Sequence, residues 1–211
     1  MKIFEINPKD PSQEAIQEAV KMIKWGGSVV YPTDTVYGLG VEALSERAVS
    51  RLFKIKKRPL NKPVPVMVKD IAMAKKLAFI DRKIERVLER VWPGPVTVVL
   101  EKRGIVPTIL TAGQPKIGLR IPDYQLTQLL MEQLDQPITT TSANFSGEPP
   151  LLCAEEIIKI FQKIYPRPDL ILDAGCLEKK SPSTVLDLTG PKPKILRLGP
   201  VSKKDLLDIL E

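Results

Sequence analysis

The sequence predicts an α/β fold in which one sheet is covered by helices. Segments with helical apolar spacing alternate along the chain with short apolar runs that end in polar loops, and this alternation is typical of α/β proteins. With 211 residues, 43% of them hydrophobic, the chain can form one sizeable core. It contains no internal repeat and no linker. We therefore expect one domain over residues 1–211.

The first helix is expected to begin near Asp10, which can cap it. Pro11 suits the first helical position, and Gln13 would complete a capping box. The apolar residues that follow repeat at helical spacing. The pair Gly26-Gly27 should end this helix.

A strand at 28–31 follows and leads into the polar loop "PTDTVYGLG". Ser45 is expected to cap a second helix, which should end at Arg58 because Pro59 disfavours helical geometry in the preceding residue. Farther along, the patterns predict strands at 65–68, 96–100, 117–120, 137–141, 170–172, 184–188 and 195–198, and helices at 71–76, 81–91, 125–134 and 154–165 before a last helix.

The composition limits the chemistry that the chain can perform. It has no histidine, which excludes a histidine-based nucleophile relay and histidine metal ligands. Its 32 Lys and Arg outnumber 25 Asp and Glu, a net charge of +7 that favours anionic partners such as nucleotides, phosphate or RNA. Solvated surface lysines would give the same count.

Two cysteines, Cys153 and Cys176, are too far apart for a CxxC pair. A disulfide between them would be unusual in a reducing compartment, so we expect inert, partly buried side chains. The N-terminus lacks the apolar region of a signal peptide, and no run approaches the roughly 20 residues that span a bilayer. We expect a soluble cytoplasmic protein without a membrane partner.

Four polar segments lie where apolar strands or helices end, and in α/β proteins ligands bind where strands end. The segments are "PTDTVYG", "KKRPLNKP", "KIGLR" and "TTTSANFSG". A shared site at these four ends is a hypothesis from the sequence.

Each segment also has a structural alternative. Lys56, Arg58 and Lys62 could clamp a polyphosphate, but cations are also favoured at a helix C-terminus by the helix dipole. Arg120 could hold a carboxylate through two parallel hydrogen bonds or form a surface ion pair. The hydroxyls of 139–142 could bind a ligand or simply complete a strand and a turn.

Five motifs occur in one order: "GGSVVYPTDTVYGLG", the Lys-x-Arg of "KKR", "WPGPVTVVL", "GLRIP" and the Ser-x-Asn of "TTSAN". With these motifs the chain resembles the YrdC family, the threonylcarbamoyl-AMP synthases, from about the first helix to "LRLGP". The resemblance implies a YrdC-like twisted mixed β-sheet flanked by helices with an open basic groove, in a single-domain form without the extra C-terminal domain of longer members. A related subfamily shares the opening loop, but Lys56-x-Arg58 and Ser142-x-Asn144 favour the synthase.

The resemblance also implies the reaction. L-threonine, bicarbonate and ATP would condense to threonylcarbamoyl-AMP with release of pyrophosphate, and other proteins would use the product to modify tRNA. Mg²⁺ should accompany the triphosphate, with no dedicated protein metal site. A carbamate decomposes readily in water, so we expect a closed groove around it.

Site residues follow from the resemblance position by position. L-threonine would contact Thr35, Arg120, Thr140 and Ser183. ATP would contact Arg58, Lys62, Lys116, Ser142, Asn144 and Arg197, with Pro150 at one further nucleotide-lining position. Lys56 and Arg58 would be catalytic. Met67 stands where some longer members have a histidine, which implies that histidine is not needed.

Two other functions stay open at this point. The first is an RNA-binding protein of the same fold without synthase activity, although aromatic residues are few and none lies within the basic segments. The second is a different carbamoyl- or phosphoryl-transfer enzyme on the same scaffold. Threonine-dependent release of pyrophosphate distinguishes both from the synthase.

Overall fold

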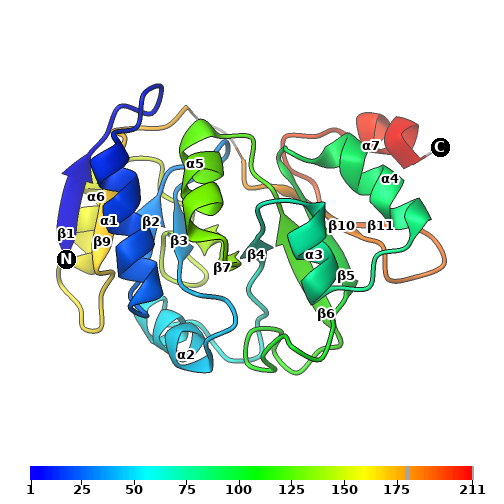
Figure 1. Cartoon of the computed structure of the whole chain (residues 1–211), viewed down its shortest axis with the longest axis horizontal. Coiled ribbons are helices and arrows are strands. Elements are labelled where there is room, and N and C mark those ends of the chain that lie inside the picture. The colour runs from blue at the N-terminus through cyan, green and yellow to red at the C-terminus, as the bar shows by residue number, and fades with distance from the viewer. Residues whose placement is uncertain (179–180, 211) are drawn as a thin grey trace.

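The strands form two mixed sheets that stand side by side in the computed structural model (Figure 1), which describes residues 1–178 and 181–210. Within these residues one sheet has the strand order β1-β9-β2-β3-β8 and the other the order β11-β10-β5-β6-β4-β7. The mixed α/β class predicted from the sequence is confirmed. The expectation of one sheet is wrong, because strand pairing is non-local and alternation along the chain does not reveal it.

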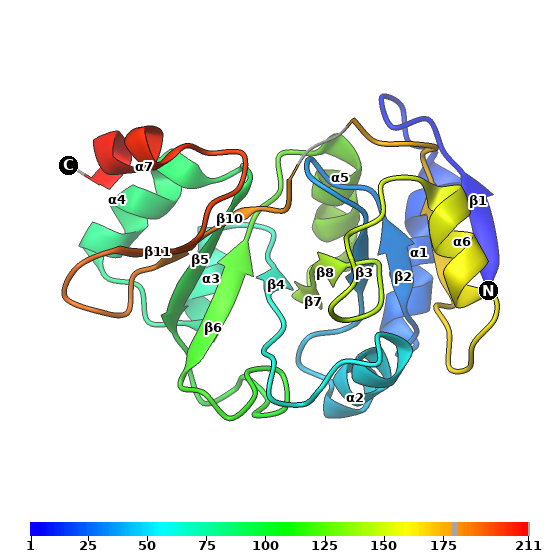
Figure 2. The same ribbon diagram turned by 180° about the vertical axis from the view of Figure 1, so that it is seen from behind.

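The five-stranded sheet lies on the left in Figure 1, and helices cover both of its faces. Helices α1 (Gln13–Lys24) and α5 (Gln125–Leu134) cover one face, and α6 (Ala154–Phe161) covers the other face, as Figure 2 shows from behind. Its strands are β1 (Lys2–Glu5), β2 (Val29–Tyr31), β3 (Gly38–Gly40), β8 (Thr141–Ser142) and β9 (Leu170–Asp173), and α2 (Glu46–Ile55) lies below them in the view of Figure 1.

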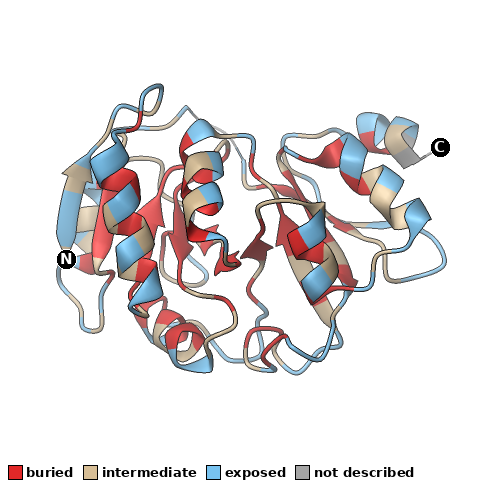
Figure 3. Ribbon diagram, in the orientation of Figure 1, coloured by how far each residue is buried: buried red, intermediate tan, exposed pale blue. Residues whose placement is uncertain are grey.

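The six-stranded sheet carries α3 (Ile71–Leu77), α4 (Arg82–Val91) and α7 (Lys203–Leu210). Its strands are β4 (Val66–Met67), β5 (Val96–Glu101), β6 (Lys116–Arg120), β7 (Ile138–Thr139), β10 (Thr184–Asp187) and β11 (Lys194–Arg197). Figure 3 shows that the central strands of both sheets and the inward faces of their helices are buried. Among the described residues, no helix is long and apolar enough to cross a membrane.

The chain passes from one sheet to the other at Thr140. The sequence predicts one strand at 137–141, but β7 pairs with β4 and β8 pairs with β3. Thr140 between them donates its backbone N–H to the carbonyl of Pro65 at 2.8 Å. This crossing joins the two sheets where polar segments from each meet.

Capping residues in the sequence predicted the starts of α2 and α4 correctly, but not the start of α1. Ser45 and Asp81 cap α2 and α4 through side-chain oxygens that accept from backbone N–H groups three residues on. Asp10 does not cap α1. Ser12 has the extended backbone of a cap, and its Oγ accepts from Ala15 N at 3.3 Å.

Helix α2 ends three residues earlier than expected. Its last residue is Ile55, and Lys57 adopts a left-handed conformation with φ 49°. The backbone N–H of Arg58 then returns to the carbonyl of Phe53 at 2.9 Å. This tight helix end turns the chain at Arg58 toward the junction of the sheets.

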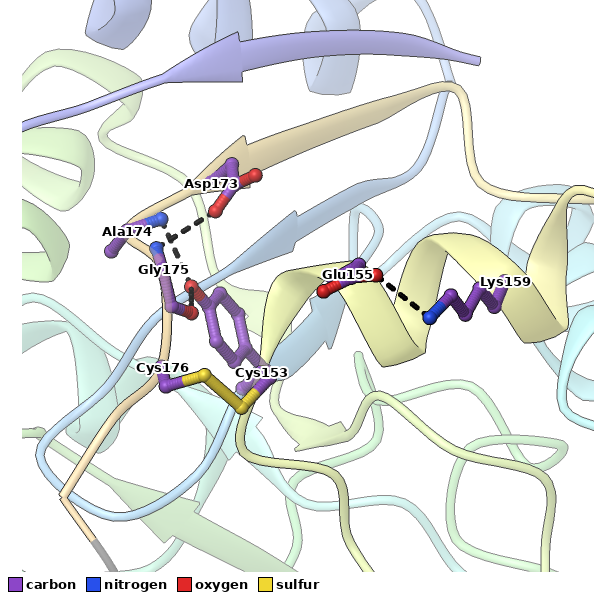
Figure 4. The surroundings of a disulfide bond; sticks show 8 residues. Cys153, Glu155, Lys159, Asp173, Ala174, Gly175 and Cys176 are labelled. Atoms are coloured by element: carbon purple, nitrogen blue, oxygen red, sulfur yellow. Dashed lines mark hydrogen bonds and ion pairs between the residues drawn. A yellow bond between two sulfur atoms is a disulfide. The ribbon is translucent and has the colours of Figure 1, made fainter.

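Cys153 and Cys176 form a disulfide, so the expectation of unpaired cysteines is wrong (Figure 4). The segments around them run antiparallel, with Ala154 N donating to Gly175 O at 3.2 Å and Leu177 N to Leu152 O at 2.9 Å. This pairing places the two Cα atoms 4.0 Å apart. A separation of 23 residues in sequence gives no sign of it. Cys153 is half-buried as expected, whereas Cys176 is exposed.

Candidate functional site

The loop after β2 is an internally bonded turn that connects β2 to β3. Thr33 Oγ1 accepts from the backbone N–H groups of Thr35 at 3.1 Å and Val36 at 3.3 Å, and it donates to Val36 O at 2.7 Å. This pattern closes the turn on itself, as threonine hydroxyls often do. The side chain of Thr35 is thereby held beneath the surface, with 2% of the residue exposed.

The two glycines of β3 make room for the ring of Tyr31. A Cβ at Gly38 would lie 2.9 Å from that ring, and a Cβ at Gly40 would lie 2.8 Å from it. Tyr31 in turn donates its hydroxyl to Thr139 O at 3.0 Å. The glycines therefore serve the packing of a buried tyrosine between β3 and the crossing segment.

A cavity of about 280 Å³ lies at the junction of the two sheets. It collects side chains from the turn after β2, the loop after α2, the end of β6, the crossing at Thr140, and β11. The sequence-predicted residues that line it are Thr35, Arg58, Arg120, Thr140, Ser142, Asn144, Pro150, Ser183 and Arg197. The shared site proposed from the four polar segments is thus one cavity. What these residues bind stays a prediction.

Three predicted residues lie outside this cavity. Lys116 lines an adjoining cavity of about 380 Å³, which shares Arg58 and Arg197 with the first, and its Nζ lies 3.1 Å from an oxygen of Asp187. Lys62 is exposed and lines neither cavity, although its carbonyl accepts from Arg58 Nε at 3.1 Å. Lys56 is the third.

Lys56 is buried in the wall behind the cavity, with 1% of the residue exposed. Its Nζ donates to the carbonyl of Ser142 and, at 2.7 Å, to the carbonyl of Asn144; Asn144 Oδ1 lies 3.4 Å away. Burial, with the charge of Arg58 nearby, lowers the pKa of Lys56 to about 7. Lys56 therefore supports the Ser-x-Asn turn from behind, and it does not reach the cavity.

The Ser-x-Asn turn is fixed by its own side chains as well. Ser142 Oγ donates to Asn144 Oδ1 at 2.5 Å, and Asn144 Nδ2 donates to Glu148 O at 2.5 Å. Because the proton of the Ser142 hydroxyl points to Asn144, the oxygen offers lone pairs to its other neighbours. Glu148, which carries a carboxylate, also lines the cavity.

Three arginines face the cavity from different elements. Arg58 donates to the carbonyls of Lys62 and Pro63, and Arg197 donates to the carbonyl of Ser183 at 3.0 and 2.7 Å. Burial lowers the pKa of each arginine, but a guanidinium remains charged at any physiological pH. Among the described lining residues Glu148 is the single carboxylate, so the cavity suits an anion.

Arg120 is the most buried of the three, with 4% exposed. Its Nε donates to Gly94 O at 3.0 Å, its Nη1 donates to Thr35 Oγ1 at 3.0 Å, and its Nη2 forms an ion pair with Asp34. The sequence pattern alone assigns no definite role to Asp34. The only local signal was an acidic residue beside threonines in "PTDT".

No cluster of three or more His, Cys, Asp or Glu that could hold a metal ion is found within 1–178 and 181–210. Besides the carboxylate of Glu148, the residues that line the cavity offer guanidinium groups, hydroxyls and an amide. Such groups orient anions and neutralise developing negative charge. The hydroxyls have no histidine that could activate them as nucleophiles.

Comparisons with known proteins identify relatives of this chain. A family model named for Sua5, YciO and YrdC and described as "Telomere recombination" matches residues 21–199. The chain is 35% identical over 207 residues to the threonylcarbamoyl-AMP synthase of Pyrococcus abyssi, a match that covers 97% of this chain. It spans only 60% of the length of that relative.

Two solved structures share the fold over nearly the whole chain. The crystal structure of P. abyssi Sua5 complexed with L-threonine superposes with a TM-score of 0.92 at 33% identity, covering 99% of this chain and 61% of that one. The crystal structure of Escherichia coli YciO superposes with a TM-score of 0.87 at 32% identity, covering 98% and 100%. The E. coli YciO relative is named an uncharacterized protein.

Proposed function

The chain belongs to the Sua5/YciO/YrdC family, and we propose that it is a threonylcarbamoyl-AMP synthase. One observation carries the proposal: a single cavity holds a buried arginine among hydroxyls beside two further arginines at its rim. The first arrangement suits an amino acid, and the second suits phosphates. Two findings support this choice: a relative is named threonylcarbamoyl-AMP synthase, and a related solved structure is complexed with L-threonine.

The proposed reaction joins three substrates. The amine of L-threonine and bicarbonate form a carbamate with loss of water. An oxygen of this carbamate attacks the α-phosphorus of ATP, the bond to the β-phosphate oxygen breaks, and pyrophosphate leaves. Because the adenylyl group moves onto the carbamate, the enzyme is a nucleotidyltransferase.

Residues of the cavity have separate roles in this proposal. Arg120 pairs with the carboxylate of threonine, and Thr35, Thr140 and Ser183 contact its other polar groups. Arg58 and Arg197 face the phosphates, where the two guanidinium groups neutralise charge that develops on the leaving pyrophosphate. Ser142, whose hydroxyl proton goes to Asn144, accepts from a hydrogen-bond donor of the nucleotide. The catalytic contribution is alignment and charge neutralisation, which need no histidine.

The adjoining cavity extends the nucleotide site. It shares both phosphate-facing arginines with the cavity of about 280 Å³ at the sheet junction, called the central cavity from here on. It continues between apolar residues to Lys116. We assign it to the nucleoside of ATP, with Lys116 at its edge. Lys62 is exposed beside Arg58 and could reach a nucleotide only by a change of side-chain conformation.

Further substrates and partners belong to the same proposal. Mg²⁺ would arrive with the triphosphate, since the described residues supply no carboxylate cluster for it. The product would pass to proteins that modify tRNA, and we assign the activity to the cytoplasm. Bicarbonate would enter the cavity next to the threonine amine.

Threonine-dependent release of pyrophosphate from ATP tests the proposal. The purified chain should release pyrophosphate with L-threonine and bicarbonate, and much more slowly with L-serine or without an amino acid. Arg58→Ala should reduce the rate by about a hundredfold or more, since a guanidinium facing the phosphates is removed. Pyrophosphate release that does not depend on threonine would reject the assignment.

Arg90→Ala is a suitable control for that variant. Arg90 lies on α4, donates to Ile209 O at 2.7 Å, and is not among the residues that line either cavity. Its replacement should leave the rate within about twofold of wild type. Salt-dependent RNA binding without pyrophosphate release would favour the RNA-binding alternative instead.

A further inference from the structure

Asp34 holds the guanidinium of Arg120 from outside the central cavity. It is not among the residues that line this cavity; it lines another cavity, of about 350 Å³, on the other side of the turn after β2. One of its oxygens forms the ion pair with Arg120, and the other accepts from the backbone N–H of Asp123 at 3.2 Å. Asp34 is thus tethered between β6 and the segment that follows it.

The bonds of Arg120 leave two of its N–H groups without an acceptor among the described residues. A guanidinium has five N–H groups, and in the described chain three of them have acceptors: Gly94 O, Thr35 Oγ1 and Asp34. One N–H therefore remains on each terminal nitrogen. A carboxylate that takes both would be bound in the two-point manner typical of arginine.

Burial makes the charge of Asp34 important for this position. The side chain of Arg120 is 5% exposed and that of Asp34 is 11% exposed. Burial and the nearby Arg197 disfavour the charged guanidinium, whereas Asp34 favours it. An unpaired buried cation is strongly destabilised, so without Asp34 the side chain of Arg120 would turn toward water or another acceptor.

The guanidinium of Arg120 also orients the hydroxyl of Thr35. Thr33 Oγ1 uses its proton on Val36 O, so in its 3.1 Å contact with Thr35 the donor is Thr35 Oγ1. Thr35 Oγ1 accepts from Arg120 and donates to Thr33. A lone pair of Thr35 remains for a donor in the cavity, such as an amine. Displacement of Arg120 would disturb this acceptor too.

From these contacts we infer that Asp34 is a positioning residue for amino-acid recognition, acting through Arg120 and Thr35 without touching the substrate. The inference rests on the proposed function and names the group that sets the affinity of its amino-acid site. It concerns the amino acid and not ATP, because the phosphate-facing arginines Arg58 and Arg197 bond to backbone carbonyls and not to Asp34.

The test is Asp34→Asn, which keeps the shape of the side chain and removes its charge. The KM for L-threonine in pyrophosphate release should rise by about tenfold or more, with the KM for ATP and kcat at saturating threonine within about threefold of wild type. Asp123→Asn is the matched control: the same change on an exposed neighbour that lines the same 350 Å³ cavity. It should leave the KM for threonine unchanged.

A double-mutant cycle separates positioning from general destabilisation. In an Arg120→Lys background, Asp34→Asn should add little to the KM for threonine, because its effect passes through the guanidinium. If Asp34→Asn does not fold, Asp34→Glu, which retains the charge, should fold and bind threonine more tightly than Asp34→Ala, as measured by calorimetry.

The outcomes distinguish this inference from the proposed function. A wild-type chain that neither binds threonine nor releases pyrophosphate with it overturns both. An active wild type with an unchanged threonine KM in Asp34→Asn overturns the positioning role alone. A lower KM in that variant also overturns it, since Asp34 would then compete with the substrate carboxylate for Arg120.

Discussion

Lys56 is a buried cation whose side-chain hydrogen bonds within the described residues go to the Ser-x-Asn turn. The side chain crosses the wall between the end of α2 and β8, segments that lie 86 residues apart in sequence. A lysine in a basic segment is usually solvated. The structure instead uses this one to hold Ser142 and Asn144 at the cavity, so its effect on catalysis would be indirect.

The lowered pKa of Lys56 predicts how stability changes with pH. Between about 7 and its ordinary value of 10.5 the folded state binds fewer protons than the unfolded state, so stability should rise with pH across this window. The stability that depends on Lys56 being neutral is fully present above pH 10.5. It decreases as the pH falls and is lost once the pH has fallen through about 7.

Lys56→Met keeps the aliphatic chain and removes the titrating group. The difference in free energy of unfolding between wild type and this variant, measured with urea from pH 6.5 to 9.5, should increase with pH. A difference that is flat across this range would mean that the carbonyls around Nζ hold the proton, and the predicted pH dependence would be wrong.

Residue types at the site were predictable, but the directions of their side chains were not. Arg58, Arg120, Ser142 and Arg197 lie together because each follows or ends an element whose exit the sequence marks. Lys56 was expected at the site because it belongs to the Lys-x-Arg motif together with Arg58. Its direction is set by carbonyls across the junction, and Asp34 has a role only because Arg120 is folded against it.

Between elements, Asp169 joins the starts of two parallel strands to a helix. It precedes β9, and its carboxylate accepts from the backbone N–H of Ser28 at 2.8 Å, from Ser28 Oγ at 2.9 Å and from both terminal nitrogens of Arg51 on α2. Although burial alone would raise it, these hydrogen bonds bring the pKa of Asp169 below its ordinary value. Asp169 thus ties α2 to the end of the sheet at which β2 and β9 begin.

Asp169→Asn should lower the free energy of unfolding by about 2 kcal/mol at pH 7, since hydrogen bonds to a charged acceptor are weakened. Because the folded pKa lies below the ordinary value of 3.8, the advantage of wild type is present above pH 3.8 and should vanish as the pH falls further. Urea unfolding at pH 7 and pH 3 measures this. Glu155→Gln, in an exposed pair with Lys159, is the control and should change little. An equal loss at both pH values would contradict the prediction.

The disulfide between Cys153 and Cys176 is a second link between elements, and it lies at the start of α6. Non-reduced chain denatured in urea should contain no free thiol, since both cysteines are paired. Closing a loop of 23 residues contributes about 3 kcal/mol in chain-entropy accounts, so reductant should lower the unfolding temperature of wild type.

Cys153→Ser with Cys176→Ser is the control for that experiment. The double variant should have the lower unfolding temperature without reductant and should not respond to it. Two reactive thiols in the non-reduced wild type would show that the bond does not form in solution.

Elements with strong local signals were predicted well. Helix α5 begins and ends at the expected residues, 125 and 134, because its apolar spacing and length are local properties. Strand β1 was missed because three of its four residues are exposed, and β3 because "GLG" carries no strand propensity. The strand expected at 137–141 is divided between two sheets, a property of partner strands that local patterns do not contain.

At the scale of the molecule, the cavity lies between the two sheets and takes residues from each. Thr35 and Ser142 come from the five-stranded sheet and its turn, and Arg120 and Arg197 come from the six-stranded sheet. A ligand that contacts all four would connect the sheets in addition to the crossing at Thr140. Binding should therefore be coupled to the stability of the whole fold.

This coupling predicts the effect of substrates on unfolding. A ligand at about 100 times its Kd that binds only the folded state adds about 2.7 kcal/mol to the free energy of unfolding. For a chain of this size this raises the unfolding temperature by several degrees.

L-threonine and a non-hydrolysable ATP analogue should each raise the unfolding temperature in this way. Arg120→Ala should lose the shift with threonine and keep much of the shift with the nucleotide, and Arg58→Ala should show the reverse, because the two arginines face different substrates in one cavity. Scanning calorimetry measures both shifts. If each variant lost both shifts equally, the cavity would not be divided into an amino-acid side and a phosphate side as proposed.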